Sequence, residues 1–110
     1  MPEAQCPMDL YDYLPAFLTD ARLQIAQMRS ALEKFKSNTD EAMTVLHRGF
    51  HTLGGTSGTM KLQPLYDLCR TSEAMAKSLI ASHASLSDND RTMLIDAVNA
   101  VEAEIERIEA

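Results

Sequence analysis

Tryptophan is absent from this sequence of 110 residues, aromatic residues make up 5% of it, and cysteine occurs twice. Four glycines and four prolines supply few turn residues, so a β-sheet protein with its frequent turns is not expected. No stretch approaches the roughly 20 apolar residues that a membrane-spanning helix needs. The N-terminus carries neither a basic region nor an apolar run, unlike a signal peptide. These absences predict a soluble, cytoplasmic protein.

Positive charge is also scarce, because ten Lys and Arg residues stand against 16 Asp and Glu residues and the net charge is −6. The phosphates of nucleic acids and of anionic lipids repel such a surface, so neither a nucleic acid nor a membrane is expected as a partner. Cys6 and Cys69 lie far apart and form no Cys-x-x-Cys pair. We expect both to be free thiols in a reducing compartment.

Helical periodicity is the dominant pattern in the sequence. Apolar residues recur three and four positions apart, as they do in helices that bury one face. The pattern predicts a loose tail at 1–8, a first turn or short helix at 9–13, and helices over about 14–35, 40–60, 64–82 and from 88 onward. Four amphipathic helices joined by short links predict an all-α fold, an antiparallel up-down-up-down four-helix bundle over residues 9–110.

Capping residues mark two of the helix starts. Asn38 or Thr39 is placed to cap the second helix. Ser87 with Asp90 has the spacing of a capping box for the fourth, with Asp in place of the usual Glu.

The second predicted helix carries a histidine and a cluster of glycines. At about 100° per residue, His51 points about 130° away from the middle of the apolar face, towards solvent. Gly54, Gly55 and Gly58 follow it, and Gly49 precedes it. Glycine inside a helix costs about 0.5–1 kcal/mol relative to alanine, so the cluster indicates that another surface comes close. A bare patch beside an exposed imidazole is what a partner protein needs to reach that ring.

An exposed imidazole offers a defined chemistry. With an ordinary pKa of about 6.5, histidine is largely neutral near pH 7 and keeps one nucleophilic ring nitrogen, which can attack phosphorus to form a phosphoramidate. The sequence contains no phosphate-binding loop and no kinase signature. The phosphoryl group would therefore come from another protein's active site and return to one. We expect neither an autonomous enzyme nor a cofactor.

The segment from Phe50 to Leu62, FHTLGGTSGTMKL, resembles the signature of histidine phosphotransfer (HPt) domains. The resemblance extends over about residues 9–108 and is strongest to the HPt domains of chemotaxis-type and twitching-motility-type sensor kinases. It implies that His51 carries the phosphoryl group and that Gly55 keeps the neighbouring surface low. The implied partners are the receiver domain of a response regulator and a sensor histidine kinase, in trans or in the same parent chain. It also implies that Glu73 accepts a hydrogen bond from the other ring nitrogen.

Two positions depart from the family pattern. The family's lysine, three residues after the histidine, is Gly54 here, and Lys61 stands where the family usually has glycine. Arg48, Lys61 and Arg70 are candidates to supply the missing positive charge. A receiver is expected to dock around the histidine on Thr44, Arg48, Thr52, Gly54, Gly55, Gly58 and Thr59. The missing lysine leaves a second hypothesis, a degenerate HPt-like adaptor that docks receiver domains without efficient phosphotransfer.

Other reactive side chains offer weaker candidates. His47 and His51 have the spacing of two metal ligands on one helix face, but no neighbouring carboxylate or cysteine completes a ligand set by sequence spacing, so no metal site is predicted. We interpret His47 as a boundary residue beside the phosphorylation face. Cys69 is expected to be buried, and the acidic residues of the last helix are expected to form a solvated face.

Overall fold

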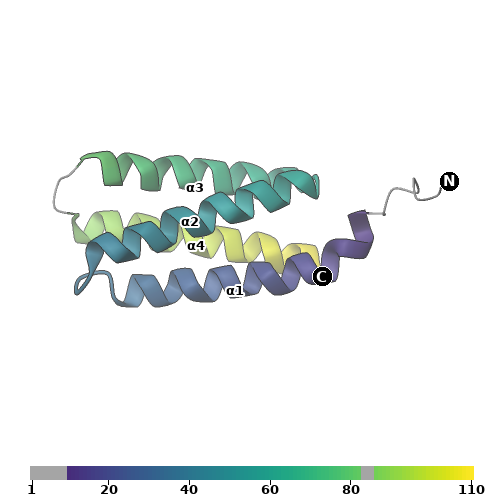
Figure 1. The fold of residues 1–110 in the computed structure, drawn as a ribbon, viewed down its shortest axis with the longest axis horizontal. Coiled ribbons are helices and arrows are strands. Elements are labelled where there is room, and N and C mark those ends of the chain that lie inside the picture. Colours follow the sequence, from purple (N-terminus) through teal and green to yellow (C-terminus); the bar gives the residue numbers. More distant parts are fainter. Residues whose placement is uncertain (1–9, 83–85) are drawn as a thin grey trace.

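Four long helices follow one 3-10 turn in the computed structural model, which describes residues 10–82 and 86–110 (Figure 1). The elements are η2 (Leu10–Tyr13), α1 (Leu14–Glu33), α2 (Thr39–Thr59), α3 (Gln63–Ser82) and α4 (Asp88–Glu109). The order and the approximate bounds of the predicted helices are thus confirmed, and η2 is the short N-terminal helix expected at 9–13. The predicted tail over 1–8, with Cys6 in it, lies outside the described residues.

The four helices form an antiparallel bundle in which sequence neighbours are also spatial neighbours. Helix α1 packs on α2 and α4, and α3 packs on the same two helices. The chain direction alternates from one helix to the next, as the colours of Figure 1 show. None of the helices in the described part of the chain is long and apolar enough to cross a membrane.

Side-chain caps fix where α2 and α4 begin. The side chain of Asn38 accepts a hydrogen bond from the backbone N–H of Glu41 at 3.4 Å. At the start of α4, Ser87 Oγ accepts from the N–H of Asp90 at 3.1 Å, while the Asp90 carboxylate accepts from the N–H of Ser87 at 2.9 Å. Both caps occupy otherwise unpaired N–H groups of a first helical turn, as the sequence predicted.

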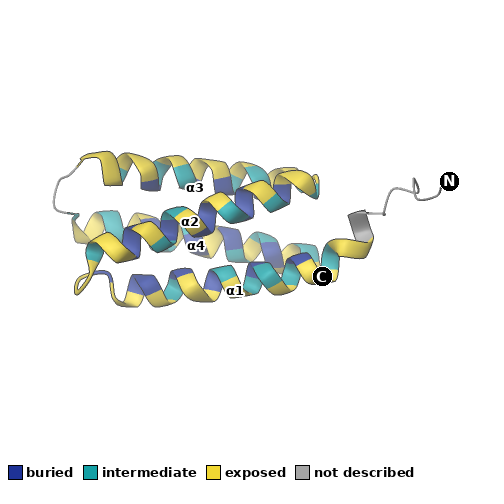
Figure 2. Ribbon diagram, in the orientation of Figure 1, coloured by how far each residue is buried: buried dark blue, intermediate teal, exposed yellow. Residues whose placement is uncertain are grey.

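The core runs along the axis of the bundle, where the buried stripes of the helices meet (Figure 2). Its largest fully buried side chains come from all four helices and include Met28, Leu46, Phe50, Leu53, Leu65, Leu94, Val98, Val101 and Ile105. Helix α1 ends at Glu33, two residues before the predicted end. Phe35 is buried, but it lies in a turn and not in a helix. The last turn of α1 is instead closed by Arg91 of α4, whose Nε and Nη2 each donate to the Leu32 carbonyl at 3.2 Å.

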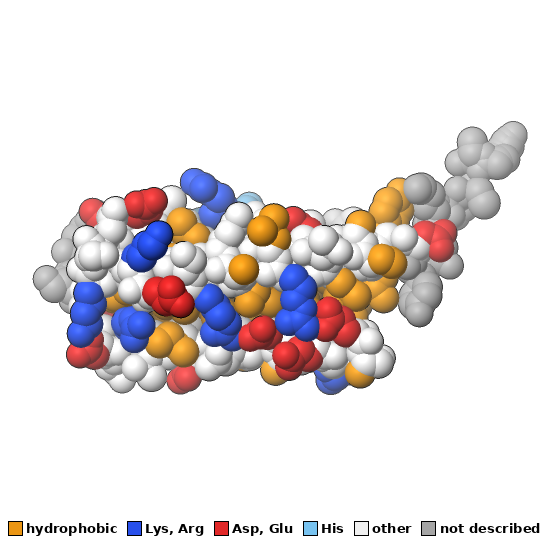
Figure 3. Space-filling model, turned by 90° about the horizontal axis from the view of Figure 1, so that it is seen from below, with side chains coloured by type: hydrophobic (Ala, Val, Ile, Leu, Met, Phe, Trp, Pro, Cys, Tyr) orange, Lys and Arg blue, Asp and Glu red, His pale blue; other side chains and the backbone are white. Residues whose placement is uncertain are grey.

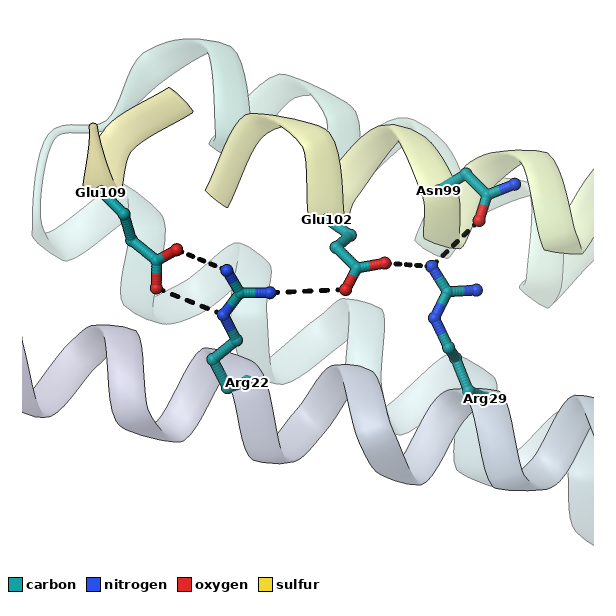
Figure 4. A network of polar contacts seen from close by, with 5 residues as sticks. All are labelled: Arg22, Arg29, Asn99, Glu102 and Glu109. Atoms are coloured by element: carbon teal, nitrogen blue, oxygen red, sulfur yellow. Dashed lines mark hydrogen bonds and ion pairs between the residues drawn. The ribbon is translucent and has the colours of Figure 1, made fainter. Parts of the chain in front are cut away.

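Ion pairs cross between α1 and α4 (Figure 4). Arg22 pairs with Glu109 and with Glu102, the latter at 3.3 Å, and Arg29 pairs with Glu102 and donates to Asn99 Oδ1 at 2.9 Å. Acidic and basic side chains accordingly mix along the α1–α4 side of the surface (Figure 3). Glu109 is exposed, as expected for a solvated face on α4, whereas Glu102 is half-buried between Arg22 and Arg29 of α1. Exposed pairs of this kind add little stability, but they favour one register of α1 against α4.

Candidate functional site

Helix α2 presents His51 on the outer surface of the bundle. Phe50 and Leu53, which flank it closely in sequence, are fully buried, and their burial fixes the rotation of α2 about its axis. The His51 side chain is 64% exposed as a result. An imidazole placed in this way is open to a partner molecule without any change in the fold.

Glu73 of α3 lies directly beside the ring. Its Oε2 is 2.6 Å from His51 Nδ1, while the Glu73 side chain is only 15% exposed. An ionised carboxylate has no proton to donate, so Nδ1 carries the hydrogen and donates it to Oε2. The other ring nitrogen, Nε2, is thereby left with its lone pair. The predicted proximity of Glu73 to His51 is present in the structure.

The charge state of Glu73 reflects opposing influences. Burial favours the neutral form, but the hydrogen bond and charge of His51 act against it, as do the charges of Arg70 and His47, and the net result lowers the pKa of Glu73. Glu73 is therefore a carboxylate at neutral pH. It can stabilise positive charge on the imidazole next to it.

His47 lies one turn before His51 and faces the same carboxylate. Its Nε2 is 3.7 Å from Glu73 Oε2, and the two histidine rings stack with centroids 6.2 Å apart and an interplanar angle of 14°. Among the described residues, no group of three or more His, Cys, Asp or Glu side chains is arranged to hold a metal ion. His47 is half-buried and contacts the same carboxylate as His51.

Arg70 of α3 is the cation that the fold brings to this carboxylate. Its Nη1 lies 3.5 Å from Glu73 Oε1, and its guanidinium carbon lies 5.8 Å from the centre of the Tyr66 ring. The Arg70 side chain is 51% exposed, so the guanidinium stays accessible from solvent.

The other two candidate cations lie elsewhere. Arg48 faces the α1 side of α2, where it lines a hollow of about 650 Å³ with residues of α1, and within the described residues it has no ion pair. Lys61 follows α2 and sits ten residues after His51, about 15 Å away along a helix axis. Lys61 lies outside α2 with a φ of 60°, and its role as a supporting cation stays a prediction.

The glycines that follow His51 differ from one another. A Cβ built on Gly55 would meet no atom within 4 Å, and Gly55 is exposed. A Cβ on Gly54 would lie 3.3 Å from Arg70 Cδ, and one on Gly58 would lie 3.0 Å from the Tyr66 ring. The expectation that Gly54 belongs to the exposed docking surface is wrong, because Gly54 is buried beneath α3. Gly58 is exposed but is approached closely by Tyr66.

The threonines proposed for docking surround His51 along α2. Thr44 and Thr59 are exposed and Thr52 is half-buried. The hydroxyl of Thr44 donates to the Asp40 carbonyl at 3.0 Å, and that of Thr59 donates to the Gly55 carbonyl at 3.1 Å. Their hydroxyl protons are thus engaged within the helix, and the oxygens remain available as acceptors.

Tyr66 of α3 contacts Arg70 and Gly58 and was not among the candidate site residues. It lies on one stripe of α3 with Arg70 and Glu73, at positions i, i+4 and i+7. This spacing in the sequence could have identified Tyr66. If Glu73 faces His51, the two residues on the same face of α3 also face α2.

Cys69 lies under this stripe and takes no part in the accessible site. Its thiol is free and fully buried. Burial, reinforced by the charge of Glu73, raises the pKa of Cys69 to about 12. The side chain therefore behaves as a small apolar core residue.

Comparison with known proteins gives two matches. A family model described as Hpt domain matches residues 12–110. The chain is also 25% identical over 101 residues to the chemotaxis protein CheA of Halobacterium salinarum, an alignment that covers 90% of this chain and 15% of that protein. The chain thus spans only a small part of the length of this curated relative. No solved structure matches the chain.

Proposed function

Because the chain belongs to the Hpt domain family, we propose that it is a histidine phosphotransfer domain that accepts and donates a phosphoryl group on Nε2 of His51. The observation that carries this proposal is the 2.6 Å contact between His51 Nδ1 and Glu73. It leaves a nucleophilic lone pair on the other ring nitrogen, Nε2, of a side chain that is 64% exposed.

The transfer step follows from this arrangement. The lone pair of Nε2 attacks the phosphorus atom of the donor, an N–P bond forms, and the bond from phosphorus to the leaving oxygen breaks, with its electron pair staying on that oxygen. The imidazole keeps its proton on Nδ1 and so gains positive charge. Glu73 stabilises this charge through the hydrogen bond that it already accepts, so no proton has to leave the ring.

A partner supplies the remainder of the chemistry. The His51 side chain is 64% exposed, so the imidazole meets its donor on an open surface. We take the partners to be the receiver domain of a response regulator and a sensor histidine kinase, in trans or in the same parent chain, with this domain acting as carrier and not as kinase. The free thiol of Cys69 is compatible with the reducing cytoplasm, where we place this exchange.

Docking of the receiver is proposed to use the side of α2 that carries Gly55. Thr52 and Thr59 flank that glycine. Arg48 and Thr44 lie further towards the N-terminal end of α2. Because a Cβ on Gly55 meets no atom of the chain within 4 Å, a larger side chain there would extend from the open surface that the partner needs. We expect Gly55→Trp to fold normally and to block transfer.

The proposal is tested with a receiver domain charged by acetyl phosphate. Wild-type protein should take up label that is acid-labile and stable to base, as phosphohistidine is, whereas His51→Gln should take up none. Equal labelling of the two proteins would remove His51 from the mechanism. The docking-only adaptor is less well supported, because the hydrogen bond to Glu73 would then serve no purpose; wild-type protein that binds the receiver without labelling would favour it.

A further inference from the structure

Two side chains of α3 pack against α2 beyond His51, Arg70 at Gly54 and Tyr66 at Gly58; we call them the α3 arm. The Tyr66 ring occupies the space next to Gly58, where a Cβ would come within 3.0 Å of it. The side chain of Arg70 crosses Gly54, where a Cβ would come within 3.3 Å of its Cδ. Two of the glycines of α2 therefore make room for this chain's own α3, which lets the arm lie close against the helix.

The guanidinium of Arg70 lies next to the carboxylate of Glu73, which also contacts His51. Glu73 Oε2 accepts from His51 at 2.6 Å, while Arg70 Nη1 stands 3.5 Å from the other oxygen, longer than an ordinary charged hydrogen bond. The Arg70 side chain is 51% exposed and faces the Tyr66 ring at 5.8 Å. Arg70 thus lies near the site, its contact with Glu73 is long, and its guanidinium is open to a further ligand.

Phosphorylation creates a need for such a charge. A phosphoryl group on Nε2 brings about two negative charges to a ring whose other nitrogen already contacts the Glu73 carboxylate. Like charges at this separation repel one another unless a cation lies between or beside them. Of the lysines and arginines in the described chain, Arg70 is the one paired with Glu73.

We infer that the α3 arm is the phosphoryl-binding element of this domain: the Arg70 guanidinium binds the phosphoryl oxygens on His51, and Tyr66, Gly54 and Gly58 position it. The inference rests on the proposed function. Arg70 forms no covalent bond; it turns from its long contact with Glu73 to the incoming phosphoryl group while the N–P bond forms and the donor P–O bond breaks. Its planar N–H fork suits two phosphoryl oxygens at once.

The test compares single-turnover transfer from a phosphorylated receiver, and the lifetime of the phosphohistidine formed, in matched variants. Arg70→Gln keeps most of the side-chain length but removes the charge, and we expect transfer to slow about tenfold. Arg70→Lys should restore part of the rate, which a purely structural role would not explain. The ³¹P chemical shift of the phosphohistidine should titrate at higher pH in Arg70→Gln, because the nearby cation favours the dianion.

The glycines supply a second, independent comparison. Gly54→Ala places a methyl group 3.3 Å from Arg70 Cδ and should displace the arm. We expect a several-fold slower transfer in this variant. Tyr66→Leu removes the aromatic ring that Arg70 faces at 5.8 Å and should resemble Arg70→Gln.

The outcomes separate this inference from the proposed function. If Arg70→Gln transfers at the wild-type rate with an unshifted ³¹P titration while His51→Gln stays unlabelled, the α3 arm has no such role and the carrier function stands. If His51→Gln is labelled like wild type, the proposed function itself fails. Circular dichroism melts of each variant establish that the folded protein is being compared.

Discussion

Replacing Glu73 by glutamine isolates the charge of this residue from its hydrogen bond. Glutamine has nearly the same shape and keeps a side-chain oxygen that accepts from His51 Nδ1, but it cannot offset positive charge on the imidazole. Glu73→Ala removes both the acceptor and the charge. Comparison of the two variants therefore divides the contribution of Glu73 into orientation of the ring and electrostatic stabilisation.

The expected magnitude follows from the geometry. Hydrogen bonds to charged groups contribute roughly 1.5–3 kcal/mol, against about 0.5–1.5 kcal/mol for neutral ones. The Glu73 side chain is 15% exposed, so solvent screens its 2.6 Å contact with Nδ1 only in part. A loss of about 1.4 kcal/mol slows transfer about tenfold, which is our expectation for Glu73→Gln. Glu73→Ala should slow it by about 100-fold, because the tautomer is then no longer fixed.

The assay is single-turnover transfer from a phosphorylated receiver at pH 7.5, with saturating carrier so that docking does not limit the rate. Equal rates for wild type and Glu73→Gln would refute the electrostatic part of the reasoning, and equal rates for Glu73→Ala would refute the role of Glu73 altogether.

Glu73→Gln should also change how the stability of the fold depends on pH. Since the folded protein lowers the pKa of Glu73, the charge stabilises the fold above the ordinary pKa of about 4.3, and this advantage over Glu73→Gln should disappear as the pH falls through the lowered value.

Three further predictions concern packing around α2 and are checked by chemical denaturation or thiol labelling. Gly49→Ala should destabilise the fold by about 1–3 kcal/mol, because its Cβ would lie 2.6 Å from Sδ and 2.7 Å from Cγ of the fully buried Met28, which would have to shift. Lys61→Gly should stabilise it by about 1 kcal/mol, because Lys61 holds a φ of 60° that favours glycine. Cys69, with a pKa of about 12, should be a thiolate in about one molecule in 10,000 at pH 8, so alkylation in a variant lacking the other cysteine should require unfolding.

The fold was predictable because each signal in the sequence was local. Spacing of apolar residues depends only on helical periodicity, and the caps at Asn38 and Ser87 act within a few residues of themselves. The error at the end of α1 has the same origin, since an apolar pattern reports burial, and Phe35 is buried without being helical. Pairings between helices, such as Arg22 with Glu109, leave no comparable local signal.

The site was predictable only in part, for a physical reason. His51 could be assigned to the outer surface from periodicity, and the nearness of Glu73 followed from the family resemblance. The glycines were harder, because a glycine in a helix indicates that something comes close without indicating what. At Gly54 and Gly58 the neighbour is Arg70 or Tyr66 of the same chain, whereas the sequence reading assigned that space to a partner.

The separation of the glycines makes the surface around His51 asymmetric, and this constrains how a partner approaches. Viewed along α2, Gly55 lies about 40° to one side of His51 and Gly54 about 60° to the other. The Gly54 side is occupied by Arg70, and the Gly55 side is open. A receiver that delivers a phosphoryl group to Nε2 therefore meets bare helix on one side of the ring and this chain's own cation on the other. The open surface at Gly55, which gives a partner access, and the positive charge of Arg70 thus lie on opposite sides of the imidazole.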